Sequence, residues 1–212
     1  MKSQEDDMND MLAQYYVDGT SVHGKSVEDL NPYLMPDPDY GDPVEFYTLN
    51  GAQIHRLANI VGDVIVGPGS RIDAYCTITG HVRIGKNTHI ATGCCIFGGG
   101  GVFIGDYVGL SGGTKIYSAT EDVSGDWITN PTVSDEFRNP HKAEIHIEDH
   151  CVMGAGSIIF PGGFMPEGAY LGALSMCKEA LLPWSINVGV PSRMVRRRSR
   201  GALAKAKAWE AR

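Results

Sequence analysis

Long apolar runs are absent from this chain of 212 residues. No stretch approaches the roughly 20 consecutive apolar residues that a membrane-spanning helix needs. The opening sequence, MKSQEDDMND, is acidic and lacks the apolar core of a secretory signal. We therefore expect no membrane span and a cytoplasmic location.

Cysteine is scarce and shows no pairing pattern. The five cysteines are an odd number, and no Cys-x-x-Cys occurs among Cys76, Cys94, Cys95, Cys151 and Cys177. The sequence therefore predicts neither a disulfide framework nor a zinc knuckle. We expect buried free thiols that pack as small apolar side chains.

Basic residues are few in the first part of the chain and concentrated at its end. Residues 1–50 carry eleven acids and two bases, whereas residues 193–212 carry eight bases and one acid. Such an asymmetry is typical of either a basic arm for a polyanion or a solvated helix. Because the net charge is −7 and no aromatic residues alternate with the bases, we expect no nucleic-acid binding.

A period of six residues is what the chain does contain. Small or β-branched residues mostly stand two positions before each repeated apolar residue, and glycine or a small polar residue often follows it. The register continues across a glycine run at 98–101 and a long insertion at 117–143. The repeated positions are Ile54, Ile60, Val66, Ile72, Ile78, Ile84, Ile90, Ile96, Ile104, Leu110, Ile116, Ile147, Met153, Ile159, Met165, Leu171 and Cys177.

This spacing predicts an all-β fold, a left-handed parallel β-helix over residues 51–177. A helix would bury residues three and four apart, and a plain strand would not turn at every sixth residue. Six residues form one flat face of a three-sided prism, whose successive coils stack at about 4.7–4.9 Å by parallel strand pairing. The segment 117–143 interrupts the coils as a long loop, which we expect to help build a site. Its alternative interpretation is a surface excursion without function.

Short helical appendages are expected at both ends. The acidic segment 1–50 is predicted to be partly helical, with an amphipathic helix over 4–16. The tail 178–212 is predicted to contain a basic helix at 202–209, because that segment is rich in helix formers. We expect Leu203 and Trp209 to pack on the end of the prism and cap its strand edges. Arg197, Arg198 and Arg200 are interpreted as part of a solvated basic helix.

The repeat resembles the hexapeptide-repeat acyltransferase superfamily, and the likeness covers roughly residues 51–197. Its most specific part is Gly189-Val190-Pro191-Ser192-Arg193, which is similar to the Gly-x-Pro-[AS]-[KR] element of the sugar and xenobiotic acetyltransferases. The resemblance implies a homotrimer with active sites at the subunit interfaces. It also implies transfer from acyl-CoA, in particular acetyl-CoA, to an amino or hydroxyl group of a sugar or sugar nucleotide for surface polysaccharide, for example lipopolysaccharide, biosynthesis. A hydroxylated antibiotic is a further candidate acceptor.

Candidate residues for binding coenzyme A follow from this resemblance. Exposed backbone near Ala155 and Ala173 would contact the pantetheine arm. Arg193 and Arg196 match the basic positions of the family and would bind phosphates, for which guanidinium groups are well suited. Lys178 is a weaker candidate, at a place where the family often has threonine.

The general base is the main departure from the family, because its usual histidine position falls on Glu121. A carboxylate is a poor base for a hydroxyl unless burial raises its pKa. Three solutions remain open. Glu121 or its neighbour Asp122 is a tuned base, His141 or His150 replaces it, or an amine acceptor attacks the thioester without a strong base.

Two other classes share this fold. A γ-class carbonic anhydrase-like protein needs three histidine ligands on zinc, and the pattern cannot be assembled from His81, His89, His146 and His150. We therefore predict no metal site. A non-catalytic trimeric β-helix used for assembly stays open, because the histidine of the family is missing.

Overall fold

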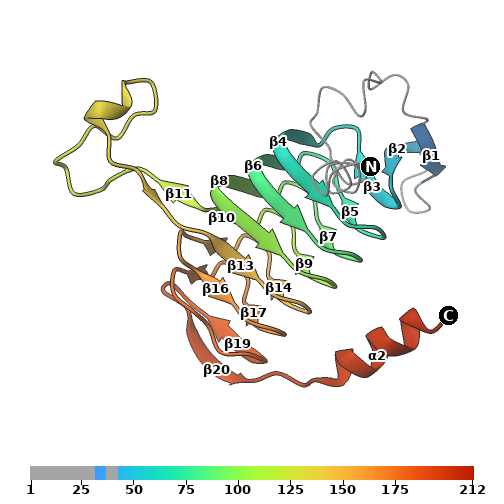
Figure 1. Cartoon of the computed structure of the whole chain (residues 1–212). Coiled ribbons are helices and arrows are strands. Elements are labelled where there is room, and N and C mark those ends of the chain that lie inside the picture. Colours follow the sequence, from blue (N-terminus) through green and yellow to red (C-terminus); the bar gives the residue numbers. More distant parts are fainter. Residues whose placement is uncertain (1–31, 37–42) are drawn as a thin grey trace, which may run out of the picture.

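The computed structural model describes residues 32–36 and 43–212, and most of this part is a prism of short stacked parallel strands (Figure 1). The parallel pairing repeats coil after coil, so the predicted β-helix is confirmed. The helix that we expected over 4–16 lies outside the described residues.

Three flat faces make up the prism. Face 1 contains the first halves of three long strands, β4 (Asn59–Val66), β6 (Thr77–Ile84) and β8 (Cys95–Ile104). Three short strands follow on this face, β10 (Lys115–Tyr117), β15 (Ile158–Ile159) and β18 (Met176–Cys177). Face 2 contains the second halves of β4, β6 and β8, followed by β13 (Ile145–Ile147) and β16 (Phe164–Met165). Face 3 contains β3 (Ala52–His55), β5 (Arg71–Ile72), β7 (His89–Ile90), β9 (Gly109–Leu110), β14 (Val152–Met153), β17 (Tyr170–Leu171) and β19 (Ser185–Val188).

The core lies inside the prism and consists of the residues that the period identified. Every repeated apolar position from Ile54 to Cys177 is at most 6% exposed. The preceding small residues are buried as well, except Ala58, which is partly buried against the core. Four of the five cysteines are buried free thiols, and Cys95 is half-buried on face 1.

Glycines allow the coils to approach closely at the corner between faces 1 and 2. Gly80 has a φ of +87°, and a Cβ there would lie 2.7 Å from the carbonyl carbon of Gly98 in the next coil. The extra residues of the glycine run fall at this corner, where the register shifts between the pairs Gly80–Gly98 and Val82–Val102. The first interruption of the period is therefore absorbed without disturbing the core.

Antiparallel strands cover both ends of the prism. At one end β1 (Pro32–Pro36) pairs with β2 (Pro43–Leu49), which pairs with β3. At the other end the stacking continues beyond the predicted limit at Cys177 as far as β19, which pairs with β20 (Arg193–Arg197). Strand pairing, and not the terminal helix, therefore caps the prism.

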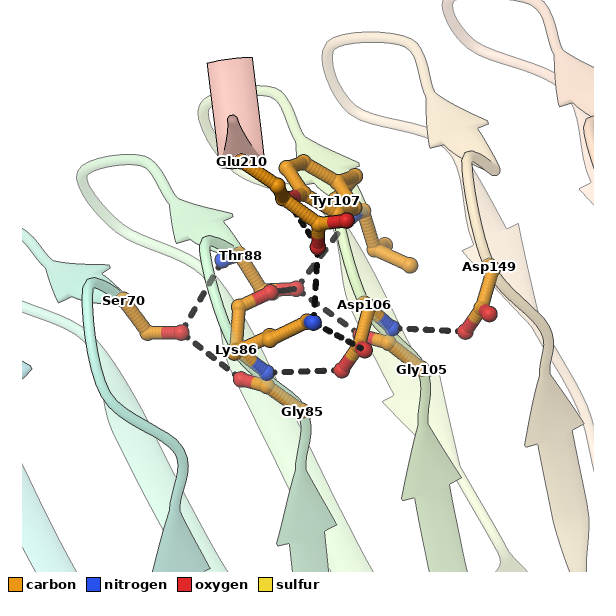
Figure 2. Close-up of polar contacts among 10 residues, drawn as sticks. Ser70, Gly85, Lys86, Thr88, Gly105, Asp106, Tyr107, Asp149 and Glu210 are labelled. Atoms are coloured by element: carbon orange, nitrogen blue, oxygen red, sulfur yellow. Dashed lines mark hydrogen bonds and ion pairs between the residues drawn. The ribbon is translucent and has the colours of Figure 1, made fainter. Parts of the chain in front are cut away.

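The predicted C-terminal helix exists as α2 (Gly201–Glu210), but its predicted packing is wrong. Leu203 is 36% exposed and Trp209 is 58% exposed. The helix is instead held at the side of the prism by Glu210, which accepts hydrogen bonds from Lys86 and Tyr107 at 2.7 Å each (Figure 2). Polar contacts and not apolar burial therefore position α2.

The long insertion leaves the prism as an arm, which we define as residues 119–142. Its two ends pair as the antiparallel strands β11 (Ala119–Thr120) and β12 (His141–Lys142), and a 3-10 helix, η2 (Asp135–Phe137), lies within it. The arm connects β10 on face 1 to β13 on face 2 and projects away from the prism (Figure 1). No helix of the described residues is long and apolar enough to cross a membrane.

Candidate functional site

The base of the arm contains two of the predicted catalytic residues. Glu121 follows β11 and forms an ion pair with Arg138, which also contacts Asp135 at 3.0 Å. This carboxylate raises the pKa of Arg138. His141 lies exposed on β12, opposite Thr120. The ion pair between Glu121 and Arg138 therefore links the two sides of the arm.

The neighbouring Asp122 is also engaged in local contacts. Its carboxylate accepts hydrogen bonds from the backbone N–H and the hydroxyl of Ser124, and these lower the pKa of Asp122. Asn139, from the returning side of the arm, contacts the other carboxylate oxygen at 3.4 Å. The partial burial of Asp122 acts in the opposite direction but is outweighed by these hydrogen bonds, so the pKa is not raised as a general base would require.

The third predicted catalytic residue, His150, lies at another corner. It has a φ of +60° in the turn between β13 and β14, which places it between faces 2 and 3. Its ring lies between Tyr107, at a centroid distance of 5.2 Å, and Trp184, at 6.2 Å. One chain therefore does not bring His150 together with Glu121 and His141, which lie at the corner between faces 1 and 2.

Arg197, Arg198 and Arg200 were predicted to lie on a solvated basic helix, and this prediction is wrong. Arg197 ends β20, and the helix α2 begins only at Gly201. Arg198 is bound to the prism. Its guanidinium donates hydrogen bonds to the carbonyls of His150 at 2.7 Å and Gly168 at 2.9 Å. It also lies 5.9 Å from the centre of the Trp184 ring. Arg198 therefore attaches the segment after β20 to the corner that carries His150.

The candidate coenzyme residues gather at the third corner and at the end of the prism. Ala155 and Ala173 occupy equivalent exposed turns of successive coils between faces 3 and 1, and the N–H of Leu174 donates to the carbonyl of Ala155 at 2.9 Å. Lys178 and Arg193 both line a hollow of about 270 Å³ at the end of the prism. Arg196 lies exposed further along β20 and does not line this hollow.

Face 2 carries a group of polar and aromatic side chains that the sequence did not identify as neighbours. His81 contacts Asp63 at 2.7 Å, and His146 contacts Glu144 at 2.9 Å. Phe103 lies between the two imidazoles, stacked on His146 at 4.8 Å and edge-on to His81 at 5.6 Å. The period does place these side chains outside the prism, because each alternates with buried residues. It could not show that they are neighbours.

A second hollow, of about 570 Å³, lies beside this group and continues toward the corner of faces 2 and 3. Phe103, His146 and Arg83 line it, together with three acidic residues, Glu148, Asp149 and Glu167. Arg83 also contacts Asp63 at 2.6 Å and, with His81, lowers the pKa of that carboxyl group. Within residues 32–36 and 43–212, no three histidine, cysteine or acidic side chains converge to hold a metal ion.

Comparison with known proteins agrees with this architecture. The family described as bacterial transferase hexapeptide (six repeats) matches residues 63–98. A dTDP-4-amino-4,6-dideoxy-D-glucose acyltransferase from Escherichia coli is 37% identical over 144 residues, which cover 66% of this chain and 75% of that protein.

Solved structures give the same result. A variant of AntD, an N-acyltransferase from Bacillus cereus, in complex with dTDP-4-amino-4,6-dideoxyglucose and coenzyme A, superposes with a TM-score of 0.73. It is 33% identical, over 76% of this chain and 88% of its own. AntD with dTDP and 3-hydroxybutyryl-CoA has the same TM-score of 0.73 and the same 33% identity, over 76% of this chain and 87% of its own. WeeI from Acinetobacter baumannii, at 23% identity and a TM-score of 0.51, shares the fold.

Proposed function

Because the chain belongs to the hexapeptide-repeat acyltransferases of the left-handed β-helix type, we propose that it acylates the amine of a dTDP-linked 4-amino-4,6-dideoxyhexose. The observation that carries this proposal is the 37% identity to an acyltransferase of that sugar nucleotide over most of its length. The complexes of AntD with coenzyme A and with the amino sugar support it. An amine acceptor also suits this chain, since a neutral amine attacks a thioester without prior deprotonation.

We propose acetyl-CoA as the donor. Its pantetheine arm would lie along the corner formed by Ala155 and Ala173, whose exposed turns repeat from coil to coil. Its phosphates would contact Lys178 and Arg193 around the hollow at the end of the prism, and Arg196 from the adjoining strand. Three cations near one end of the prism suit the several negative charges of coenzyme A.

A homotrimer with interfacial active sites is proposed for two reasons. The arm exposes four large apolar side chains between Val123 and Phe137, with Val123 96% exposed and Phe137 53% exposed, and such a group suits a subunit interface. One chain also separates His150 from the base of the arm, so a complete site would need a neighbouring subunit. Size-exclusion chromatography with light scattering would report three copies of the 22.9 kDa chain.

We further propose a cytoplasmic location and a product that enters surface polysaccharide biosynthesis. The cysteines support the location, because all five are free thiols, and free thiols persist in a reducing compartment. Glu121, His141 and His150 remain proposals for a group that acts at the acceptor. The ion pair of Glu121 with Arg138 favours an anchoring role for Glu121.

A thiol-release assay tests the proposed reaction. Purified protein with acetyl-CoA should release coenzyme A with dTDP-4-amino-4,6-dideoxyglucose and form one amide per thiol, as measured by mass spectrometry. The matched control is dTDP-6-deoxyglucose, which carries a hydroxyl where the substrate carries the amine. Equal rates with the two acceptors, or no release with either, would contradict the proposal.

A further inference from the structure

We propose that His146, held by Glu144 and seated on Phe103, accepts the proton that the acceptor amine loses during acyl transfer. This inference rests on the proposed N-acyltransferase function and assigns a catalytic residue to it. The geometry that carries it is a histidine–carboxylate pair beside a hollow, at the point where the arm rejoins the prism.

The strand β13 fixes the orientation of the pair. Ile145 and Ile147 point into the core and are at most 1% exposed, so Glu144 and His146 must lie together on the outer surface of face 2. Glu144 contacts Nε2 of His146 at 2.9 Å. A carboxylate in this position makes Nε2 the protonated nitrogen and leaves Nδ1 as the acceptor. Among the described residues, Nδ1 has no hydrogen-bond partner.

The ring of Phe103 restricts the imidazole from one neighbouring strand. His146 is in register with Phe103 on β8 and with Phe164 on β16. The Phe103 ring lies nearly parallel to the imidazole, with an interplanar angle of 12° and a centroid distance of 4.8 Å. The ring is therefore held by packing and by Glu144 together, and a base with a fixed orientation needs no reorganisation when it accepts a proton.

The position of His146 suits a site shared with the arm. Glu144 stands just after the arm, whose two ends meet where β11 pairs with β12. The side chain of His146 is 47% exposed and lines the hollow of about 570 Å³. Of the other candidate groups, Glu121 faces Arg138, and the ring of His150 lies between two aromatic rings. His146 therefore combines an open nitrogen with space for a ligand.

The proposed step balances without a further reactant. The amine nitrogen attacks the thioester carbonyl, and a C–N bond forms in a tetrahedral intermediate with a charged nitrogen. Nδ1 of His146 takes a proton from that nitrogen, the C–S bond breaks, and the thiolate of coenzyme A leaves. The imidazolium then returns the proton to the thiolate, so that the products are an amide and coenzyme A.

A matched histidine on the same face provides the control. His81 is also paired with a carboxylate, Asp63, and also contacts Phe103, but it does not line the hollow. The charged groups around His146 are Glu144 on its own strand, Arg83 on β6, and the acidic group Glu148, Asp149 and Glu167 across the hollow. The variants below leave these charged residues unchanged, so differences in rate between the variants do not come from them.

The experiment compares His146→Asn with His81→Asn in the full chain, using acetyl-CoA and dTDP-4-amino-4,6-dideoxyglucose. His146→Asn should lower kcat by about 10²- to 10⁴-fold, the usual contribution of a general base, with little change in KM for either substrate. His81→Asn should keep kcat within about twofold, since it removes a pair that does not reach the hollow.

Chemical rescue separates catalysis from folding. Added imidazole should restore part of the kcat that His146→Gly has lost. His81→Gly should keep its kcat without imidazole. Circular dichroism and oligomeric state, equal to the wild type, would confirm that each variant is folded. A His146→Asn enzyme with wild-type kcat would overturn the assignment and would favour direct proton transfer to sulfur. That outcome is distinct from failure of the proposed function, in which the wild-type chain itself releases no coenzyme A.

Discussion

Gly80 and Gly93 form a matched pair that tests how closely the coils pack. Both have a left-handed backbone, with φ of +87° at Gly80 and +70° at Gly93. A Cβ at Gly80 would lie 2.7 Å from the carbonyl carbon and 2.8 Å from the carbonyl oxygen of Gly98, whereas a Cβ at Gly93 has nothing within 4 Å. The two alanine variants therefore share the conformational cost and differ in the steric one.

The magnitudes follow from these two terms. Gly93→Ala should lose about 1–2 kcal/mol, the cost of a left-handed backbone for a residue with a Cβ. Gly80→Ala should lose about 1–3 kcal/mol more, because the obstructing atoms are backbone and the coil must shift to relieve the contact. In a chain of this length, 1 kcal/mol corresponds to about 2–4 °C in Tm.

Thermal unfolding followed by circular dichroism measures both variants at one protein concentration, since an oligomer unfolds in a concentration-dependent way. We expect Gly80→Ala to unfold at least a few degrees below Gly93→Ala. Equal Tm values for the two variants would refute the reasoning, because they would mean that the corner between faces 1 and 2 tolerates a Cβ. A lower Tm for Gly93→Ala would refute it as well.

Three further outcomes concern the coenzyme, the terminal helix and the arm. Arg193→Ala should raise KM for acetyl-CoA about tenfold or more and leave KM for the acceptor unchanged, because a charge-assisted contact to phosphate is lost; Lys205→Ala, on the exposed helix, is the control. Glu210→Gln should speed amide hydrogen exchange in α2 by weakening its contact with the prism. Arg138→Met should increase protease cleavage of the arm and lower kcat less than tenfold. If the ion pair serves only to hold the arm together, Glu121→Gln should have the same effects on cleavage and on kcat.

The same contact of α2 should depend on pH. A lysine that donates to Glu210 lowers the pKa of this carboxyl group. The contact is therefore fully present at neutral pH, where the carboxylate is charged in the folded and unfolded chain alike. It is lost as the pH falls through the lowered pKa. Hydrogen exchange of α2 that is unchanged between neutral and strongly acidic pH would contradict this.

Two results would contradict the other expectations. An unchanged KM for acetyl-CoA in Arg193→Ala would mean that the hollow at the end of the prism is not part of the coenzyme site. A Glu121→Gln variant that loses turnover while Arg138→Met keeps it would make Glu121 a base and not an anchor. Both variants are needed, because a change at either Glu121 or Arg138 alone could alter kcat by loosening the arm.

The sequence determined the interior of this protein almost completely. A residue that returns every sixth position can be buried in every coil of a three-sided prism, and no ordinary helix or sheet meets that requirement. The period therefore identified the core from Ile54 to Cys177, and all of those positions are buried. It also separated inner from outer side chains on each strand, because alternation is a local property of the backbone.

The tertiary structure alone decided which outer side chains become neighbours. Phe103 and His146 stack only because β13 rejoins the sheet beside β8 after the arm, and the length of the insertion does not specify that register. The pairing of Glu121 with Arg138 depends likewise on how the arm folds back on itself. The position of α2 depends on Glu210, although composition alone favoured burial of Trp209. A local period fixes what lies inside, whereas contacts between distant segments on the surface depend on the path of the whole chain.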